Sequence, residues 1–362
     1  MRILLALDRL FPPQRVGGVE SNADDLANAL HLRGTSVAVL ARLNLSDRYG
    51  IFAALRRTCL GGRLLPDRRG HGYPIYRSPM LTRDLPTVLR HFRPQVAVVQ
   101  AVGKLGLARL LHQHRIPTVL HFHDVEFAEP VLPFTPAGVI ANSQFTAERV
   151  EQQYSLTPTT ILNIFDAKQY RAPHLGQHVT FINPVKKKGS GTAFALAEQN
   201  PDIPFMFVEG WPLEPKARKH LLRQIAQHPN IAWQPRTHDM RKVYGATKIL
   251  LVPSLCEESW GRVVSEAQIN AIPVLASNVG GLPEAVGPGG VLLPSDDLPA
   301  WQRALRSVWD DDAKWNALSA NGQTHAARRA LDPDHIVDQY IDTLTLYATR
   351  NPLTPHPVSA AP

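Results

Sequence analysis

Short apolar runs alternate with amphipathic stretches along most of the chain. In the first half these runs are continuous rather than alternating, which is typical of parallel strands buried on both faces of a sheet. They are RILLAL (2–7), SVAVLAR (36–42), VAVVQ (96–100), TVLHFH (118–123) and GVIANS (138–143). Because amphipathic helical patterns separate them, the sequence predicts a doubly wound α/β sheet.

A second series of apolar runs begins near residue 179. It comprises VTFIN (179–183), FMFVEG (205–210), IAWQ (231–234), ILLVPS (249–254) and PVLAS (273–277). The segment 163–178 between the two series is polar and broken by proline and glycine, so we expect an interdomain hinge there. The pattern therefore predicts two Rossmann-like domains that face a central cleft, since such sheets bind ligands beyond the carboxyl ends of their strands.

The domain limits follow from these patterns. We expect an N-terminal domain over residues 1–168 and a C-terminal domain over 175–332. Helical periodicity then predicts a last helix over 333–350, and a proline-rich tail occupies 351–362. A length of 362 residues suits two such domains.

Composition narrows the class of protein. Hydrophobic residues make up 44% and charged residues 19%, which excludes a disordered chain. The net charge of +8 and a pI of about 9.6 suit nucleic acid, anionic lipid or phosphorylated substrates as partners, and charge alone does not choose among them. Nucleic acid is the weakest candidate, because no zinc ligands, RNA-binding aromatics or recognition-helix pattern accompany the charge.

Cysteines and apolar runs bear on the compartment. Cys59 and Cys256 give neither a disulfide framework nor a metal cluster, which suits a reducing compartment. The apolar start of the chain is broken by Asp8, so we interpret it as a strand rather than a signal peptide. No apolar run approaches the ~20 residues that span a bilayer. We expect a cytoplasmic protein, with any membrane contact peripheral and through the basic N-terminal domain.

An arginine-rich segment, RRTCLGGRLLPDRRG, occupies residues 56–70. One interpretation is a solvated loop. The other is a basic lip that meets an acceptor or an anionic membrane surface. The residues alone do not decide between them.

Two glutamates flank the start of a predicted helix in the second domain. Glu258 follows the strand ILLVPS, and a helix begins after Gly261 with Glu266 inside it. A helix start presents unpaired N–H groups and the positive end of the dipole to an anion, and a carboxylate can hold a vicinal diol at both oxygens. The glutamates could therefore grip the two sugars of a nucleotide sugar, although the bare spacing is better explained by two solvated carboxylates.

The wider segment gives this spacing a context. PSLCEESWGRVVSEAQINAIPVLASNVGGLPEAV (253–286) resembles the retaining GT-B glycosyltransferases of glycosyltransferase family 4. Members share two glutamates separated by seven residues, then a run like the AIPVLASNVGGLPE at 271–284. The resemblance implies that Glu266 binds the ribose of the donor and Glu258 the hydroxyls of the donor sugar. It also implies that the backbone at Gly261, Arg262 and Val263 meets the diphosphate.

Further landmarks of the same family lie elsewhere in the chain. FINPVKKKG (181–189) resembles the family segment whose lysine, here Lys188, neutralises the diphosphate. Asn183 stands where many members carry arginine, so Lys186, Lys187 or Arg262 would have to supply the missing cation. The segment QPR (234–236) lies where the donor base is bound, which makes Arg236 a donor-binding candidate.

The first domain carries scattered landmarks. GGVE (17–20) is similar to the family's N-terminal glycine loop, so the resemblance places Gly17 and Gly18 against the donor phosphates. His121 and His123 share one face of their strand. His123 is the candidate for the family histidine that contacts the donor sugar, although a histidine at a strand end is also a common structural residue. Glu284, beside Pro283, is interpreted as a structural residue at a helix start.

The resemblance implies a GT-B enzyme with an N-terminal acceptor-binding domain and a C-terminal nucleotide-sugar-binding domain. Its last helix would cross back to the N-terminal domain. The enzyme would transfer a sugar from a nucleoside diphosphate to an acceptor hydroxyl with retention, without a metal and without a further cofactor. The catalytic residues would be Glu258, His123 and Lys188. The alternatives are a nucleotide-sugar epimerase or a non-catalytic sugar-nucleotide-binding protein of the same fold.

Overall fold

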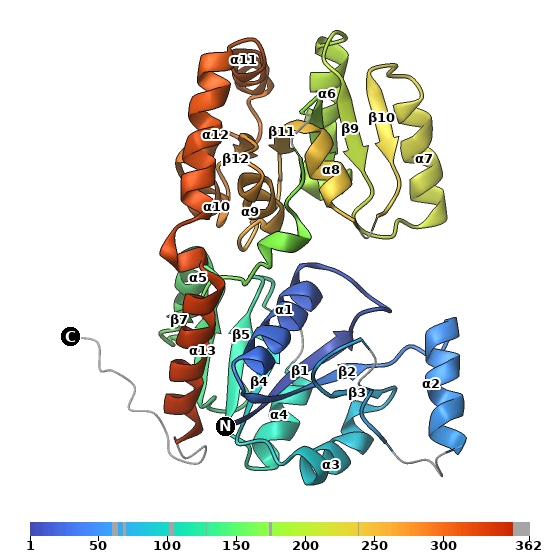
Figure 1. The fold of residues 1–362 in the computed structure, drawn as a ribbon, viewed down its shortest axis with the longest axis vertical. Coiled ribbons are helices and arrows are strands. Elements are labelled where there is room, and N and C mark those ends of the chain that lie inside the picture. The colour runs from blue at the N-terminus through green and yellow to red at the C-terminus, as the bar shows by residue number, and fades with distance from the viewer. Residues whose placement is uncertain are drawn as a thin grey trace, which may run out of the picture. The chain divides into compact units, whose positions relative to one another are not determined.

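The computed structural model describes residues 1–59, 64–67, 70–100, 105–127, 129–173, 176–237 and 239–349. The chain divides into two compact units, each built around one parallel sheet (Figure 1). Unit 1 comprises Met1–Ile164 and the chain from Asp332 onward, and unit 2 comprises Phe165–Leu331. The division falls inside the polar segment 163–178, a few residues before the expected end of the first domain at 168.

Unit 1 contains a seven-stranded parallel sheet in the order β3-β2-β1-β4-β5-β6-β7. Its strands are β1 (Arg2–Leu10), β2 (Ser36–Arg42), β3 (Ile75–Ser78), β4 (Val96–Gln100), β5 (Thr118–Phe122), β6 (Gly138–Ala141) and β7 (Thr159–Thr160). Its helices are α1 (Gly18–Leu32), α2 (Arg48–Cys59), α3 (Leu81–Phe92), α4 (Gly106–Gln113), α5 (Gln144–Tyr154) and α13 (Pro333–Ala348).

Side chains of β1 alternate between two cores. Ile3 and Leu5 pack with α1 and α13 on one face of the sheet, whereas Leu4 and Ala6 pack with α3 and α4 on the other. This alternation explains why the strand appears in the sequence as a continuous apolar run. β1 extends to Leu10, which confirms the predicted first strand.

Unit 2 contains a six-stranded parallel sheet in the order β10-β9-β8-β11-β12-β13. Its strands are β8 (His178–Ile182), β9 (Phe205–Val208), β10 (Ile231–Gln234), β11 (Thr247–Val252), β12 (Val274–Ser277) and β13 (Gly290–Leu293). Its α-helices are α6 (Ser190–Gln199), α7 (Pro215–Ile225), α8 (Arg241–Ala246), α9 (Arg262–Ile269), α10 (Leu282–Val286), α11 (Leu298–Trp309) and α12 (Asp312–Ala326). Helices α6, α7 and α11 share one core with the sheet, and α9 packs against β11, β12 and α12.

The predicted strands are confirmed in both units, and the fold is that of two Rossmann-like domains. TVLHFH and GVIANS end earlier than expected, at Phe122 and Ala141. In the second case Ser143 instead caps α5, accepting a hydrogen bond of 3.0 Å from the Thr146 amide. The short strands β3, β7 and β13 were not predicted. The tail 351–362 and parts of the basic segment 56–70 lie outside the described residues.

Helix α13 completes the core of unit 1. Asp332 caps it by accepting a 2.9 Å hydrogen bond from the His335 amide. Its buried side chains recur at helical spacing and end with Tyr340, Leu344 and Tyr347. The Tyr340 hydroxyl lies 3.0 Å from Nδ1 of the fully buried His121 on β5. A helix from the C-terminal part of the chain therefore completes the hydrophobic core of unit 1.

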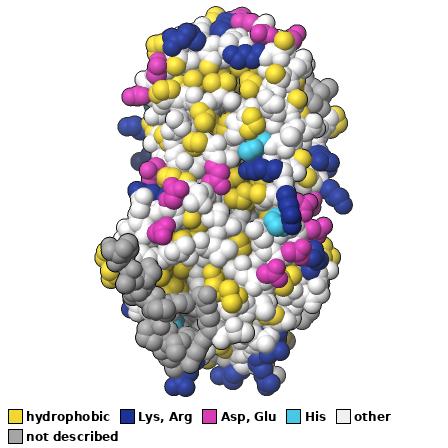
Figure 2. Space-filling model, turned by 90° about the vertical axis from the view of Figure 1, so that its left-hand side faces the viewer, with side chains coloured by type: hydrophobic (Ala, Val, Ile, Leu, Met, Phe, Trp, Pro, Cys, Tyr) yellow, Lys and Arg dark blue, Asp and Glu magenta, His cyan; other side chains and the backbone are white. Residues whose placement is uncertain are grey.

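The described surface carries both signs of charge. On the face drawn in Figure 2, Lys and Arg side chains are scattered from top to bottom, and Asp and Glu side chains lie among them in the upper and middle parts. The positively charged side chains are therefore not gathered into one patch on this face.

No helix in the described part of the chain is long and apolar enough to cross a bilayer.

Burial lowers the pKa of His121 well below its usual value, and the neighbouring His123 adds to the effect. Below about pH 6.5 the unfolded chain therefore binds a proton that the folded chain does not. Stability should fall as the pH drops from about 7 to 5, with a slope of up to about 1.4 kcal/mol per pH unit from this group.

We expect His121→Gln to flatten the dependence of the thermal midpoint on pH across this range. The exposed His114 of the same unit is the control, because His114→Gln should leave the profile parallel to wild type. Identical slopes for His121→Gln and wild type would contradict this assignment.

Candidate active site

A left-handed glycine starts helix α9 after the loop that follows β11. Gly261 has φ +84°, and a Cβ at this position would lie 2.7 Å from Cδ2 of Leu282. No side chain caps the helix. Because other residues are strained in this conformation, glycine allows the chain to turn sharply and start the helix at the carboxyl edge of the sheet. Val263 contributes backbone to this first turn.

Glu266 is buried inside α9 and held by two donors. The Tyr244 hydroxyl donates a 2.6 Å hydrogen bond to Oε2, and Nε of Arg262 lies 3.3 Å from Oε1. Burial, and then the charge of Glu266, raise the pKa of Tyr244 well above its usual value, so this hydroxyl remains a donor. These contacts orient the carboxylate of Glu266.

The Arg262 side chain is occupied within unit 2. Besides Glu266 it contacts Tyr170, whose hydroxyl accepts a 3.0 Å hydrogen bond from Nη2. Its guanidinium lies 4.3 Å from the ring centroid of Phe165. Since both ends of the guanidinium are engaged, this side chain is a poorer candidate than the lysines for a cation that compensates for Asn183.

Lys188 and Glu258 form an ion pair although they lie 70 residues apart. Their side chains are 16% and 15% exposed, respectively. The Ser254 hydroxyl donates a 2.6 Å hydrogen bond to the same Glu258 oxygen, and the Gly281 amide donates one of 2.6 Å to the Glu258 carbonyl. The structure thus brings together two of the three residues predicted to be catalytic.

Glycines allow the loops of this site to approach closely. Gly189 has φ +83°, and a Cβ there would lie 1.8 Å from the Pro253 carbonyl oxygen. The Leu255 amide also donates a 3.0 Å hydrogen bond to the Lys187 carbonyl, which joins the loop after β8 to the loop after β11. Gly280 similarly passes the loop of Glu258, with a hypothetical Cβ 2.4 Å from the Glu258 carbonyl oxygen.

Asn183 lies at the end of β8 and has φ +60°, a conformation that asparagine tolerates better than most residues. Its Oδ1 accepts a 2.7 Å hydrogen bond from the Trp211 amide. Nζ of Lys187 and Nζ of Lys188 lie 5.4 and 5.3 Å from the Trp211 ring centroid. Asn183 therefore fixes the loop that carries the aromatic neighbour of both lysines.

Arg236 is not drawn into this group. It follows the edge strand β10 and is exposed. Among the described residues it forms no hydrogen bond or ion pair, so its role in binding the donor base remains a prediction. Glu284 lies in the first turn of α10, as expected of a helix-start residue.

The glycine loop of unit 1 folds back on a buried acid. Gly17 is the residue before α1, and Gly18 begins the helix. A Cβ on Gly17 would lie 2.7 Å from Oε2 of Glu20, which is 2% exposed and pairs with Arg15 at 3.0 Å and Arg9 at 3.6 Å. Glu20 was not predicted, because an acid in the first turn of a helix is usually solvated.

His123 follows β5 at the carboxyl edge of the same sheet. Its Nε2 lies 2.6 Å from Oε1 of the fully buried Gln100, at the end of the adjacent β4. Its ring centroid is 3.8 Å from that of His121, which confirms that the two histidines share one face of the strand. Burial also raises the pKa of the neighbouring Asp124, against a smaller opposing effect of Arg9.

In each unit, several of the predicted site residues therefore lie at the carboxyl edge of the sheet. In unit 2 they are Lys188, Glu258, Gly261 and Glu266, and in unit 1 they are the Gly17–Gly18 turn and His123. Among the described residues, no group of three or more His, Cys, Asp or Glu side chains is arranged to hold a metal ion.

Two family models match this chain, one in each unit. The family model described as Glycosyltransferase Family 4 matches residues 16–169, and the one described as Glycosyl transferases group 1 matches 187–325. The chain belongs to the GT-B glycosyltransferases. The first match includes the glycine turn and His123, and the second includes Lys188, both glutamates and the start of α9, so the predicted family and fold class are confirmed.

Solved structures of this fold superpose on nearly the whole chain. Anabaena HepE in complex with UDP-glucose is 19% identical, with a TM-score of 0.74 over 95% of this chain and 99% of that one. Sucrose-phosphate synthase from Thermosynechococcus elongatus is 17% identical, with a TM-score of 0.77 over 97% of this chain and 100% of that one. At these identities the likeness establishes the fold.

Curated relatives match over a shorter stretch. The D-inositol 3-phosphate glycosyltransferase of Corynebacterium kroppenstedtii is 35% identical over 136 residues, 36% of this chain and 30% of that protein. Its counterpart in Corynebacterium urealyticum is 31% identical over 181 residues, 47% of this chain and 42% of that protein. This GT-B protein therefore matches less than half of the length of each of these relatives.

The close approach of Gly189 to Pro253 generates a stability prediction. Gly189→Ala must both adopt a positive φ and displace a backbone carbonyl, so we expect a loss of about 2–4 kcal/mol and a lower thermal midpoint. Gly191, on the adjacent turn of α6, is the matched control because nothing lies within 4 Å of a Cβ there. Gly191→Ala should be neutral or stabilising by up to about 1 kcal/mol. Equal thermal midpoints for the two variants would contradict the steric strain expected from a side chain at position 189.

Proposed function

We propose that the protein is a retaining glycosyltransferase that moves a sugar from a nucleoside diphosphate to an acceptor hydroxyl. The observation that supports this most directly is the group formed by Lys188, Glu258 and Glu266 around the start of α9. A cation, two carboxylates and a helix amino end at one sheet edge match the parts of a nucleotide sugar.

Glu266 is proposed to hold the donor ribose. Its two oxygens can accept hydrogen bonds from the 2′ and 3′ hydroxyls, while Tyr244 and Arg262 keep the carboxylate in place. The diphosphate then meets the amide groups of Arg262 and Val263 at the amino end of α9, where the helix dipole favours negative charge. Gly261 leaves room for the phosphate oxygens at this point.

Glu258 and Lys188 are proposed to act at the bond that breaks. Glu258 accepts hydrogen bonds from hydroxyls of the donor sugar, and Lys188 neutralises the diphosphate as it leaves with the bonding electron pair. A new bond forms between the anomeric carbon and the acceptor oxygen, and the acceptor proton passes to an oxygen of the leaving diphosphate. Because negative charge grows on the diphosphate, a nearby ammonium lowers the barrier.

We propose that this chemistry proceeds without a metal ion. The positive charge is supplied by Lys188, by the helix start and by the exposed Lys186 and Lys187, which follow Asn183 in the same loop. Asn183 contributes no charge, and the engaged side chain of Arg262 does not replace it. The lysines therefore take the place of the arginine that many family members carry.

In unit 1, His123 and the Gly17–Gly18 turn are proposed to serve the donor as they do in the family. The support is that His123 directly follows β5 and is oriented by a hydrogen bond, and that the glycine turn starts α1, the helix after β1. The solved complex of HepE with UDP-glucose makes UDP-sugars the first donors to test. GDP-, ADP- and dTDP-sugars complete the panel.

The alternative functions differ in what they release. An epimerase would return an isomeric sugar nucleotide, and a binding protein would return the donor unchanged. A transferase releases nucleoside diphosphate in proportion to the acceptor that is glycosylated. Donor incubation followed by chromatographic analysis of nucleotides therefore separates all three functions.

Glu266→Ala should weaken donor binding about 10- to 100-fold, since it removes hydrogen bonds to a charged acceptor worth about 1.5–3 kcal/mol. The measurement is a titration of the best sugar nucleotide of the panel, read by thermal shift and calorimetry. The exposed Glu198 on α6 provides the control, and Glu198→Ala should bind as wild type does. Unchanged affinity in Glu266→Ala would reject the proposed ribose site.

Lys188→Ala should reduce kcat about 100-fold or more while weakening donor binding less, because the charge it opposes develops mainly as the bond breaks. Release of nucleoside diphosphate under saturating donor reports this difference. Lys216→Ala, at an exposed site on α7, should retain full turnover. A Lys188→Ala enzyme with wild-type kcat would show that another group stabilises the leaving diphosphate.

A further inference from the structure

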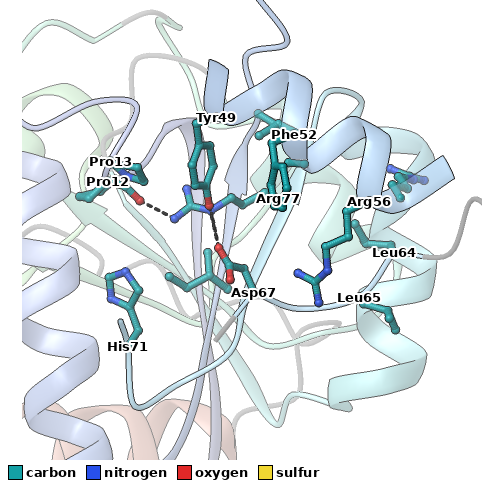
Figure 3. A pocket seen from close by; sticks show the side chains of 14 residues that line it. Pro12, Pro13, Tyr49, Phe52, Arg56, Leu64, Leu65, Asp67, His71 and Arg77 are labelled. Carbon is teal, nitrogen blue, oxygen red and sulfur yellow. Dashed lines mark hydrogen bonds and ion pairs between the residues drawn. The ribbon is translucent and has the colours of Figure 1, made fainter. Parts of the chain in front are cut away.

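A cavity of about 350 Å³ opens in unit 1, apart from the residues assigned to the donor (Figure 3). It lies beside the carboxyl ends of β1, β2 and β3, because Pro12 follows β1, Leu43 follows β2 and Arg77 is near the end of β3. Ligands of open α/β sheets bind at this edge. A volume of this size suits a small organic molecule.

Most of the cavity wall is apolar. Phe52 and Ala53 of α2 face Leu64 and Leu65 of the following segment, and Ile75 of β3 also lines the cavity. Phe52 is more than half exposed although it is a large aromatic residue. Such a wall favours a ligand with an apolar body, and it offers little to a ligand covered with hydroxyls.

Arg77 places a buried positive charge in this cavity. Its side chain is 5% exposed, and its Nη1 and Nη2 donate hydrogen bonds to the carbonyls of Phe11 and Pro12. Within the described residues Nε has no hydrogen-bond partner, since Oδ2 of Asp67 lies 3.9 Å away. Burial lowers the pKa of Arg77, which marks the cost of keeping this charge out of water. The guanidinium is therefore incompletely satisfied.

Asp67 does not neutralise Arg77 closely because it serves another partner. The Tyr49 hydroxyl donates a 2.7 Å hydrogen bond to Asp67, and burial together with this contact raises the pKa of Tyr49 to about 12. The backbone of Asp67 is tied to Ile75 by hydrogen bonds of 2.7 and 2.8 Å. Figure 3 shows the hydrogen bond between Tyr49 and Asp67, and the guanidinium of Arg77 lies 5.2 Å from the Tyr49 ring centroid.

A second arginine makes the cavity more positive. Arg57 is matched by Asp84, with hydrogen bonds of 2.6 and 2.9 Å. Arg56 also lines the cavity, and it has no hydrogen bond or ion pair in the part of the chain that the structure describes. The cavity thus combines an apolar wall with one arginine at its side that pairs with none of the described residues, and one incompletely satisfied arginine inside.

We propose that this cavity binds the acceptor, and that the acceptor is a hydroxyl compound with an apolar body and an anionic group. This proposal rests on the glycosyltransferase function proposed above. The apolar body packs against Phe52, Leu64 and Leu65, while the anionic group faces Arg56. The buried Arg77 attracts the anion through its charge, although its Nε is itself inaccessible. A polyol phosphate fits less well, because its hydroxyls would lose water against apolar side chains without gaining partners.

The experiment uses 6-hydroxy-2-naphthoate as the probe, titrated into the full-length protein by fluorescence. Saturable binding is expected, with at least a fivefold loss of affinity in Phe52→Ala and in Arg56→Ala. The neutral 6-hydroxy-2-naphthamide should bind at least fivefold more weakly than the naphthoate to the wild-type protein. The affinity for the naphthamide should also be the same in Arg56→Ala as in the wild-type protein. Glycerol 3-phosphate, a polar anion, should not displace the probe.

Matched controls are available on the same helix. Ile51 and Arg48 are exposed on α2 and do not line the cavity, so Ile51→Ala and Arg48→Ala should bind the probe within twofold of wild type. Vesicles with and without phosphatidylglycerol separate a lipid source of the anion from a soluble one. Capture on the anionic vesicles that depends on Phe52 and Arg56 but not on Ile51 identifies a lipid acceptor in the cavity. Its absence, with probe binding retained, identifies a soluble acceptor.

Failure of this proposal is distinct from failure of the function. No saturable probe binding, or equal losses in Ile51→Ala and Phe52→Ala, would overturn the acceptor cavity. Donor binding by Phe52→Ala should equal that of wild type, because Phe52 belongs to none of the donor groups. If Glu266→Ala leaves donor binding intact, the glycosyltransferase proposal fails while the probe titration still reports on the cavity.

Discussion

The ion pair between Lys188 and Glu258 depends on how closely two backbone loops approach each other. Gly189 passes the Pro253 carbonyl with no room for a side chain, and this brings the lysine loop after β8 to the glutamate loop after β11. The two charges balance each other in the protein alone, so neither stands unpaired at a partly buried edge. A ligand with a diphosphate beside a sugar offers each of them a new partner.

Other buried carboxylates are also paired with a positively charged side chain. Glu266 is held by Arg262 and Tyr244 in unit 2, and in unit 1 the buried Glu20 is held by Arg15. Each of these two buried carboxylates thus has a positive neighbour that offsets its burial. Arg77 departs from this pattern, since its Nε has no hydrogen-bond partner in the described part of the chain and its nearest acid also accepts a hydrogen bond from a tyrosine. That imbalance distinguishes the cavity of unit 1 from the Lys188–Glu258 and Arg262–Glu266 pairs of unit 2.

Sequence patterns predicted the parts of the fold that are locally encoded. Strands buried on both faces appear as apolar runs, and the helix after Gly261 follows from its glycine and its periodicity. The strand β3 was missed because IYRS holds a buried arginine and serine among only two apolar residues. Pairing of Lys188 with Glu258 was implied by resemblance alone, because spacing does not reveal contacts across 70 residues. The cavity escaped notice because segments from Pro12 to Arg77 form it jointly.

The path of the chain between the units has a consequence for biosynthesis. Unit 2 is one uninterrupted segment, whereas unit 1 needs α13, with Tyr340 and Tyr347, to close its core. On the ribosome, where chains fold as they emerge, unit 2 can therefore reach its native state while part of one face of the first sheet, the part that α13 covers, is still exposed. During that interval apolar side chains such as Val119 and Ile140 lack part of their cover. Unit 1, whose sheet is translated before unit 2, thus completes its core only after unit 2 has been synthesised.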